Sequence, residues 1–210
     1  MEYFQHFLDM LLHVDHYLSG LLAEYGLWVY AILFLVVFIE TGFIVMPFLP
    51  GDSLLFATGA MAALDLLNLS WLLGLLALAA ILGDTVNYWI GRMFGKKAYR
   101  SAWVNKQHLH KAEAFYQVHG SKTIILARFV PIVRSFAPFV AGIGRMDYYQ
   151  FIGFNVLGGI AWVSICGGAG YFFGNIPIIK QNFEFVILGI VVVSFLPVVF
   201  EYFKVRKLAP

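Results

Sequence analysis

Long runs of apolar residues separated by short polar breaks dominate the chain. Four of these runs, residues 26–46, 69–91, 148–173 and 184–203, are of membrane-spanning length. A helix needs about 20 apolar residues to cross about 30 Å of hydrocarbon. The pattern therefore predicts about four full transmembrane helices.

The first 25 residues have a different pattern, in which apolar side chains recur every three or four positions. This spacing predicts an amphipathic helix over 1–25 that lies at the membrane interface. Its polar stripe contains His6, Asp9, His13 and His16. Such a stripe could ligate a metal ion, but a solvated face is the commoner arrangement, and no metal site is predicted.

Two further apolar segments, 47–64 and 123–145, are interrupted by proline. The prolines are Pro47 and Pro50 in the first segment, and Pro131 and Pro138 in the second. Proline breaks a helix and also disfavours helical geometry in the residue before it. We expect both segments to form re-entrant hairpins, because broken backbone at membrane depth must be buried in protein or line a wet cavity.

Composition supports the membrane assignment. Hydrophobic residues make up 61% of the 210 residues and charged residues only 12%, whereas soluble domains are about 25% charged. The expected class is an all-α polytopic membrane protein with a single membrane domain and no nucleic-acid partner. The lone Cys166 excludes an intrachain disulfide framework.

Positive charge is confined to the second part of the chain. All 14 Lys and Arg residues lie at or after Arg92, and they gather in the loop 92–122 and in the C-terminal tail. The positive-inside rule places both regions in the cytoplasm. Counting spans backwards from the tail makes the two hairpins enter from opposite faces of the membrane, which is typical of an inverted repeat.

The predicted organisation is therefore two halves joined by a basic linker. After the interfacial helix, residues 26–92 contain a span, a hairpin and a span. Residues 93–122 form the cytoplasmic linker. Residues 123–205 contain the second hairpin and two spans.

Ionisable residues inside the apolar segments are the candidate functional residues. They are Glu40, Asp52, Asp84, Arg128 and Arg134, and Arg145 is a further charge in apolar surroundings. Charges in membranes usually face a cavity or one another. Arginine forks suit phosphate, and the break at Pro131 would let Arg128 and Arg134 point into one cavity. Glu40 and Asp52 are plausible proton carriers. The alternative is that Glu40 or Asp52 only forms a structural ion pair with Arg128 or Arg134.

Asp84 and Tyr88 are four residues apart and would share one face of a helix. They are possible cavity-lining residues, although Asp84 could equally cap or pair near the cytoplasmic end. The sequence has neither a GxSxG nor an HExxH motif, so no catalytic residue, cofactor or enzymatic activity is predicted.

These motifs resemble those of the bacterial DedA family, whose domain also occurs in eukaryotic lipid scramblases. The matching stretches are ETG at 40–42, PFLPGD at 47–52, GDTVNYWIGR at 83–92 and ARFVPIVRSFAPFVAG at 127–142. The resemblance implies a multi-pass protein of the bacterial inner membrane with two opposed hairpins. It also implies lipid transport linked to the proton-motive force, either of undecaprenyl phosphate or by phospholipid scrambling. The family's functional residues map onto Glu40, Asp52, Arg128 and Arg134.

We therefore expect a lipid transporter whose partners are a phosphate-bearing lipid headgroup and protons, with a homo-oligomer left open. A proton-coupled exporter of a small soluble ion or drug is the alternative function. A membrane scaffold in which the charges merely pair is a third hypothesis.

Overall fold

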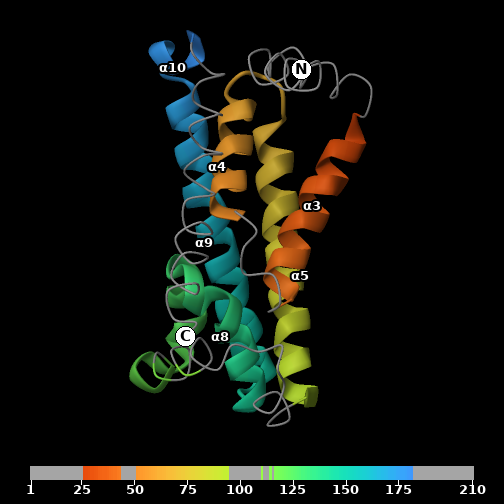
Figure 1. The fold of residues 1–210 in the computed structure, drawn as a ribbon, viewed down its shortest axis with the longest axis vertical. Helices are drawn as coiled ribbons and strands as arrows, with labels where there is room; N and C mark the ends of the chain where they lie inside the picture. The colour runs from red at the N-terminus through yellow and green to blue at the C-terminus, as the bar shows by residue number, and fades with distance from the viewer. Residues whose placement is uncertain (1–25, 44–50, 95–109, 111–113, 115, 182–210) are drawn as a thin grey trace, which may run out of the picture. The chain divides into compact units, whose positions relative to one another are not determined.

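The computed structural model describes residues 26–43, 51–94, 110, 114 and 116–181, and every regular element in these residues is a helix (Figure 1). The all-α class predicted from the sequence is confirmed for these residues. In chain order the elements are α3 (Leu27–Gly42), α4 (Gly51–Ala62), α5 (Leu69–Phe94), η2 (Gly120–Lys122), α7 (Thr123–Leu126), η3 (Ala127–Phe129), α8 (Pro131–Ile143), α9 (Tyr148–Gly174) and α10 (Pro177–Gln181).

Among the described residues, two helices are long and apolar enough to span a membrane. These are α5 with 26 residues and α9 with 27 residues, and they confirm the predicted helices over 69–91 and 148–173. Helix α3 begins as the predicted span 26–46 does but ends at Gly42, after 16 residues. The predicted span 184–203 and the interfacial helix 1–25 lie outside the described residues.

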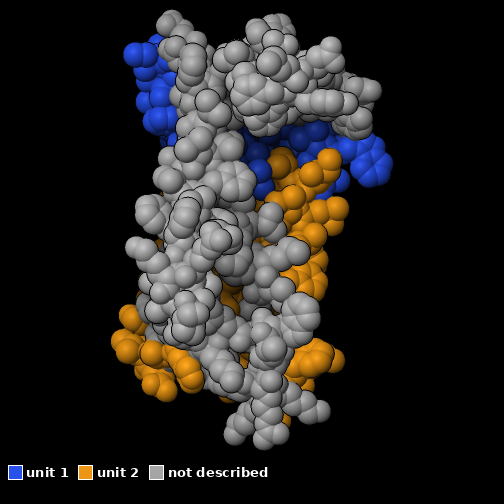
Figure 2. Space-filling view, viewed as in Figure 1, with its two compact units in different colours: residues 1–31, 50–72, 166–210 blue, residues 32–49, 73–165 orange. Residues whose placement is uncertain are grey.

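The chain divides into two compact units (Figure 2). One consists of residues 1–31, 50–72 and 166–210, and the other of residues 32–49 and 73–165. Helix α4 belongs wholly to the first unit and α8 wholly to the second.

In the first unit, α4 packs closely on the last turns of α9. A Cβ atom placed on Gly174 would lie 2.9 Å from the Cα of Ala60, and one placed on Gly170 would collide with the backbone of Phe56. Without side chains in the way, the two backbones approach closely, which is how small residues join membrane helices. The Phe56 ring also contacts that of Phe173, with 5.3 Å between centroids.

In the second unit, α8 packs on the last turns of α5 in the same manner. A Cβ atom on Gly91 would run into the carbonyl of Phe139, and one on Gly142 would run into the backbone of Tyr88. Tyr88 is fully buried and stacks on Phe151, with 4.4 Å between ring centroids. An aromatic core therefore fixes α5 against α8 and α9.

Helices α4 and α8 end in the same type of turn. The Leu66 amide donates to the Met61 carbonyl at 3.2 Å, and the Met146 amide donates to the Ala141 carbonyl at 3.0 Å. A hydrogen bond from an amide to the carbonyl five residues earlier is typical of a Schellman motif at the end of a helix. In this motif the residue before the donor adopts left-handed geometry. Asp65 (φ 60°) and Arg145 (φ 53°) occupy that position.

Each of these turns leads directly into a capped long helix. The Asn68 side chain accepts from the Trp71 amide at 3.1 Å at the start of α5. The Asp147 side chain accepts from the Gln150 amide at 3.0 Å at the start of α9. Side-chain oxygens at this position satisfy amides that have no partner within the helix. A short helix, a Schellman turn, an N-cap and a long helix thus occur twice in the chain.

The helical path is interrupted before Pro131, whereas Pro138 lies within a continuous helix. The chain leaves helical geometry at Val130 (φ −117°, ψ 103°), and α8 begins with Pro131 as its first residue. Pro138 lies inside α8, which continues to Ile143. Proline at this position removes only the bond to the Arg134 carbonyl, and the close packing of Phe139 and Gly142 on α5 supports the helix across that gap. Pro47 and Pro50 lie outside the described residues.

Candidate functional site

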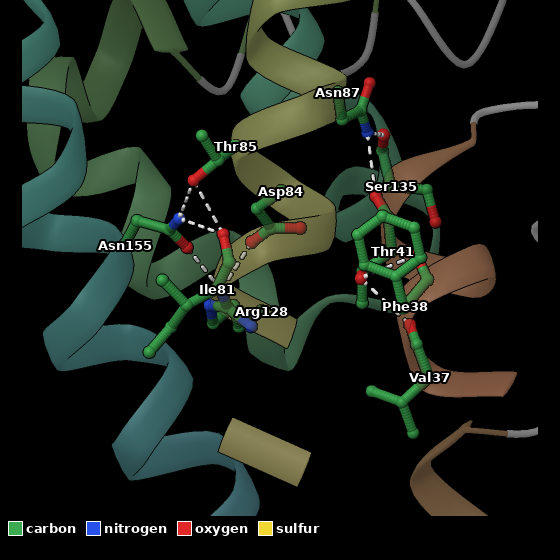
Figure 3. A network of polar contacts seen from close by, with 10 residues as sticks. All are labelled: Val37, Phe38, Thr41, Ile81, Asp84, Thr85, Asn87, Arg128, Ser135 and Asn155. Carbon is green, nitrogen blue, oxygen red and sulfur yellow. Dashed lines mark hydrogen bonds and ion pairs between the residues drawn. The ribbon is translucent and has the colours of Figure 1, made fainter. Parts of the chain in front are cut away.

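A buried ion pair joins the middle of α5 to η3. The Nη2 atom of Arg128 contacts the Oδ2 atom of Asp84, and both side chains are almost completely buried (Figure 3). The same nitrogen donates to Oδ1 of Asn155 at 2.5 Å. Arg128 projects from η3, directly before the break at Val130, so three separate elements meet at one guanidinium nitrogen.

Asn155 is itself fixed by α5. Its amide nitrogen donates to the Ile81 carbonyl at 2.9 Å and to the Thr85 hydroxyl oxygen at 3.4 Å (Figure 3). Asn155 is completely buried. Because both amide hydrogens point to α5, the side-chain oxygen is held toward Arg128.

The rest of the Arg128 guanidinium carries unsatisfied donors. A guanidinium has five N–H groups, and Nη2 uses its two on Asp84 and Asn155. The Nε and Nη1 atoms are buried and have no hydrogen-bond partner among the described residues. Three N–H groups of a buried cation therefore remain open to an acceptor, and leaving a single buried donor unpaired costs about 1–3 kcal/mol.

A second buried ion pair links α8 to α3. The Nη2 atom of Arg134 contacts Oε1 of Glu40, with 8% and 1% of the two side chains exposed. Arg134 lies in the first turn of α8, and its amide donates to the Val130 carbonyl at 2.9 Å. The break before Pro131 therefore sets the direction in which Arg134 leaves the backbone.

The Trp162 ring brings the two arginines together. The guanidinium carbon of Arg134 is 4.7 Å from the ring centroid, and that of Arg128 is 5.9 Å from it. Both distances suit a cation–π interaction. The structure thus places Arg128 and Arg134 at one ring, an arrangement that the Pro131 break allows in place of a continuous helix.

Asn155 and Trp162 were not foreseen from the sequence. Asn155, Gly158, Gly159 and Trp162 are spaced at i, i+3, i+4 and i+7 in α9, which places them on one helix face. An amide and a tryptophan on one face of an apolar helix were the pattern from which these two site residues could have been predicted. Gly158 packs against the Arg128 side chain.

A third polar contact ties α3, α5 and α8 together. The Asn87 amide nitrogen donates to the Thr41 carbonyl at 3.1 Å and to the Ser135 carbonyl at 2.8 Å (Figure 3). Helices α3 and α5 meet at glycines, since a Cβ on Gly42 would lie 3.5 Å from the Cα of Gly83. The backbone around Glu40 is therefore fixed independently of its ion pair.

The remaining candidates have the following positions. Asp52 is exposed in the first turn of α4 and belongs to the first unit, so a cavity shared with Glu40 stays a prediction.

Tyr88 shares α5 with Asp84, but its hydroxyl donates to the Met146 carbonyl at 2.5 Å and accepts from Arg92 at 2.6 Å. Tyr88 thus belongs to the core, and its lining of the arginine site is not supported.

Of the two buried ion pairs described above, one is among those predicted from the sequence and the other was not foreseen. Glu40 with Arg134 is among the pairs expected from the sequence, whereas Arg128 pairs with Asp84. The formal charges of these four side chains cancel. No group of three or more His, Cys, Asp or Glu side chains suited to a metal occurs in the described part of the chain.

Two helices of membrane-spanning length and a buried cluster of paired charges are typical of a membrane protein. Residues 49–172 match the family model of the VTT domain. The chain belongs to this family, the DedA family.

Its relatives include full-length matches. Protein DedA of Escherichia coli K12 is 52% identical over all of this chain and 98% of that protein. An uncharacterized membrane protein of Mycobacterium tuberculosis H37Rv is 40% identical over 92% of this chain and 88% of that protein. The inner membrane protein YghB of E. coli K12 is 32% identical over 73% of this chain and 72% of that protein. No solved structure matches the chain.

Proposed function

We propose that the protein carries the phosphate headgroup of a membrane lipid across the bacterial inner membrane, without covalent chemistry. The observation that carries this proposal is Arg128, a buried guanidinium between apolar helices with three N–H groups that have no partner among the described residues. Planar guanidinium donors match phosphate oxygens in geometry and charge. Relatives named as inner membrane proteins support the location.

Arg134 supplies the second positive charge of the proposed headgroup site. Trp162 keeps its guanidinium near that of Arg128, and Glu40 occupies it while no anion is bound. A phosphate arriving between the arginines would accept from the open N–H groups of Arg128 and would compete with Glu40 for those of Arg134. Release of the phosphate would let the ion pairs form again, so the site has a stable arrangement with and without its cargo.

The lipid tail is proposed to stay in the bilayer while the headgroup crosses. Large apolar side chains on the two long helices are exposed, among them Trp71, Leu78 and Leu82 on α5 and Leu157 and Ile160 on α9. Exposed apolar surface of this extent suits contact with lipid. Undecaprenyl phosphate or a phospholipid would meet these requirements.

Charge balance supports proton coupling in this proposal. The four buried side chains are neutral as a set, so an added phosphate leaves excess negative charge in a medium of low dielectric. A proton on Glu40, or on Asp52 if that residue reaches the same path, would restore the balance. Headgroup movement would then follow the proton gradient.

The proposed membrane arrangement is an inverted repeat with two re-entrant hairpins. Its support is the duplicated sequence of short helix, Schellman turn, N-cap and long helix. It is also supported by the reciprocal packing of α4 on α9 and of α8 on α5. The basic linker and the C-terminal tail are proposed to be cytoplasmic, by the positive-inside rule.

The test is a transport assay in liposomes of defined composition. Access of a headgroup-reactive reagent to the inner leaflet would be followed for undecaprenyl phosphate and for phospholipid, with and without a pH gradient. Arg134→Lys keeps the charge but loses the planar fork, so we expect a folded protein with strongly reduced transport. Full transport by this variant would remove Arg134 from the site. Movement of a soluble ion or drug without lipid would favour the exporter instead.

A further inference from the structure

We propose that Asn155 and Gly158 of α9 are positioning residues that orient Arg128 and thereby set the affinity of the site for a phosphate monoester. This inference rests on the proposed function. It assigns a role to two residues of α9 that do not themselves carry charge.

Arg128 needs an external constraint because its own backbone supplies little. It leaves from a three-residue 3-10 turn that ends in the extended residue Val130. A long side chain at such a position has many rotamers. If Asp84 were the only partner, its carboxylate could pair with any of the three nitrogens of the Arg128 guanidinium. The second acceptor, Asn155 Oδ1 at 2.5 Å, engages the remaining hydrogen of Nη2, and so the plane of the group is determined.

Asn155 can supply this constraint because its own orientation is settled. Its amide nitrogen bonds to the Ile81 carbonyl at 2.9 Å and to the Thr85 hydroxyl at 3.4 Å. If the amide were reversed, its oxygen would face the Ile81 carbonyl and its nitrogen would face a cation. Only one orientation therefore agrees with both neighbours.

Gly158 fixes the stem of the same side chain. A Cβ placed on Gly158 would lie 3.0 Å from Cδ and 3.1 Å from Nε of Arg128, and 3.3 Å from the Cα of Ile125. The stem thus lies against bare helix backbone, and the Ile125 backbone of α7 is also close to Gly158. Any side chain at position 158 would push the stem away from α9, because the Ile125 backbone leaves little room for adjustment.

Together the two contacts decide where the unpaired N–H groups of Arg128 are presented. Asp84 and Asn155 hold Nη2, and Gly158 holds the stem. The N–H groups of Nε and Nη1 have no acceptor among the described residues. Hydrogen bonds to a charged group depend steeply on distance and angle. Displacement of the guanidinium is therefore expected to weaken phosphate binding even though the charge is retained.

The experiment measures binding of decyl phosphate to the full-length protein in nanodiscs by calorimetry, with liposome transport in parallel. Asn155→Leu and Gly158→Ala are expected to bind decyl phosphate about tenfold more weakly, corresponding to the loss of one charge-assisted hydrogen bond. The half-saturating lipid concentration should change more than the maximal rate. Gly153→Ala on the same helix is the matched control, because a Cβ there meets nothing within 4 Å, and we expect unchanged affinity.

Two further variants keep the inference separable from the proposed function. If Arg128→Gln loses decyl phosphate binding while Asn155→Leu and Gly158→Ala retain it, the positioning role is wrong and the headgroup site stands. If Arg128→Gln also binds normally, the proposed function itself fails. If the Asn155→Leu variant does not fold, the Thr85→Val variant tests the positioning role of Asn155 instead. This variant removes one anchor of Asn155, and we expect about threefold weaker binding; unchanged affinity would overturn the role.

Inorganic phosphate forms the last arm. It presents the same oxygens without the apolar tail, and we expect much weaker binding than for decyl phosphate. Equal affinity for the two would assign the site to a free anion and overturn the lipid-headgroup interpretation.

Discussion

Arg134 lies with its guanidinium carbon 4.7 Å from the centre of the Trp162 ring while it is ion-paired to Glu40. Trp162 is 1% exposed, so the ring contacts protein and not lipid. Arg134 thus contacts a charged side chain of α3 and an aromatic ring of α9.

The Trp162 ring is expected to be replaceable by another aromatic ring but not by an aliphatic side chain. Cation–π contacts contribute about 0.5–2 kcal/mol depending on burial, so Trp162→Leu should reduce transport several-fold. Trp162→Phe keeps a weaker π face and should retain more activity than the Leu variant. Initial transport rates in liposomes, normalised to reconstituted protein, provide the comparison. Equal rates for the two variants would show that the ring only fills space.

Removal of the Asp84 charge should destabilise the protein strongly. Asp84→Asn leaves Arg128 buried without its counter-ion, and breaking a buried pair from one side costs about 3–5 kcal/mol. Thermal unfolding in detergent would measure the loss. The double variant Asp84→Asn, Arg128→Gln removes both charges and should recover part of the stability while remaining inactive. A double variant as unstable as Asp84→Asn alone would contradict this explanation.

Exchange of the charges of Glu40 and Arg134 separates a scaffold from a headgroup site. Glu40→Arg combined with Arg134→Glu preserves an ion pair between α3 and α8, so folding should be largely retained. Transport should not return, because the fork would then project from α3 and not from the position beside Trp162. Transport measurement on the single and double variants tests this, and restoration by the double variant would support the scaffold hypothesis.

Two glycines of α5 should respond oppositely to alanine. A Cβ at Gly91 would run into the Phe139 carbonyl, whereas a Cβ at Gly74 meets nothing within 4 Å. Gly91→Ala must push α8 away and should cost about 1–3 kcal/mol. Gly74→Ala should be neutral or stabilising by up to about 1 kcal/mol, because alanine favours the helix. Thermal unfolding of both variants under one condition measures the contrast, and equal losses would argue against close α5–α8 packing.

The sequence predicted the elements better than it predicted their partners. Helices α5 and α9 follow from uninterrupted apolar length, and the break before Pro131 follows from the geometry that proline imposes. The partner of Arg128 could not be read in the same way. Asp84 lies 44 positions away, and composition gives no reason to favour it over Glu40 or Asp52.

Pro138 and Asn155 show why the remaining details escaped prediction. Local rules treat an internal proline as a helix break, yet tertiary packing of α8 on α5 compensates for one lost hydrogen bond. Asn155 is a single polar residue in an apolar helix, and only the fold shows that its oxygen faces a guanidinium. Both features depend on neighbours that are distant in sequence.

The two Schellman turns have a consequence for how such a chain could arise. Each half ends its short helix with the same turn, yet the short helix of each half packs on the long helix of the other half. Two separate half-length chains would have the same contacts if each lent its short helix to a second copy. Duplication of a half-length gene, followed by fusion through the basic linker, would convert that swapped dimer into one chain without creating a new helix interface.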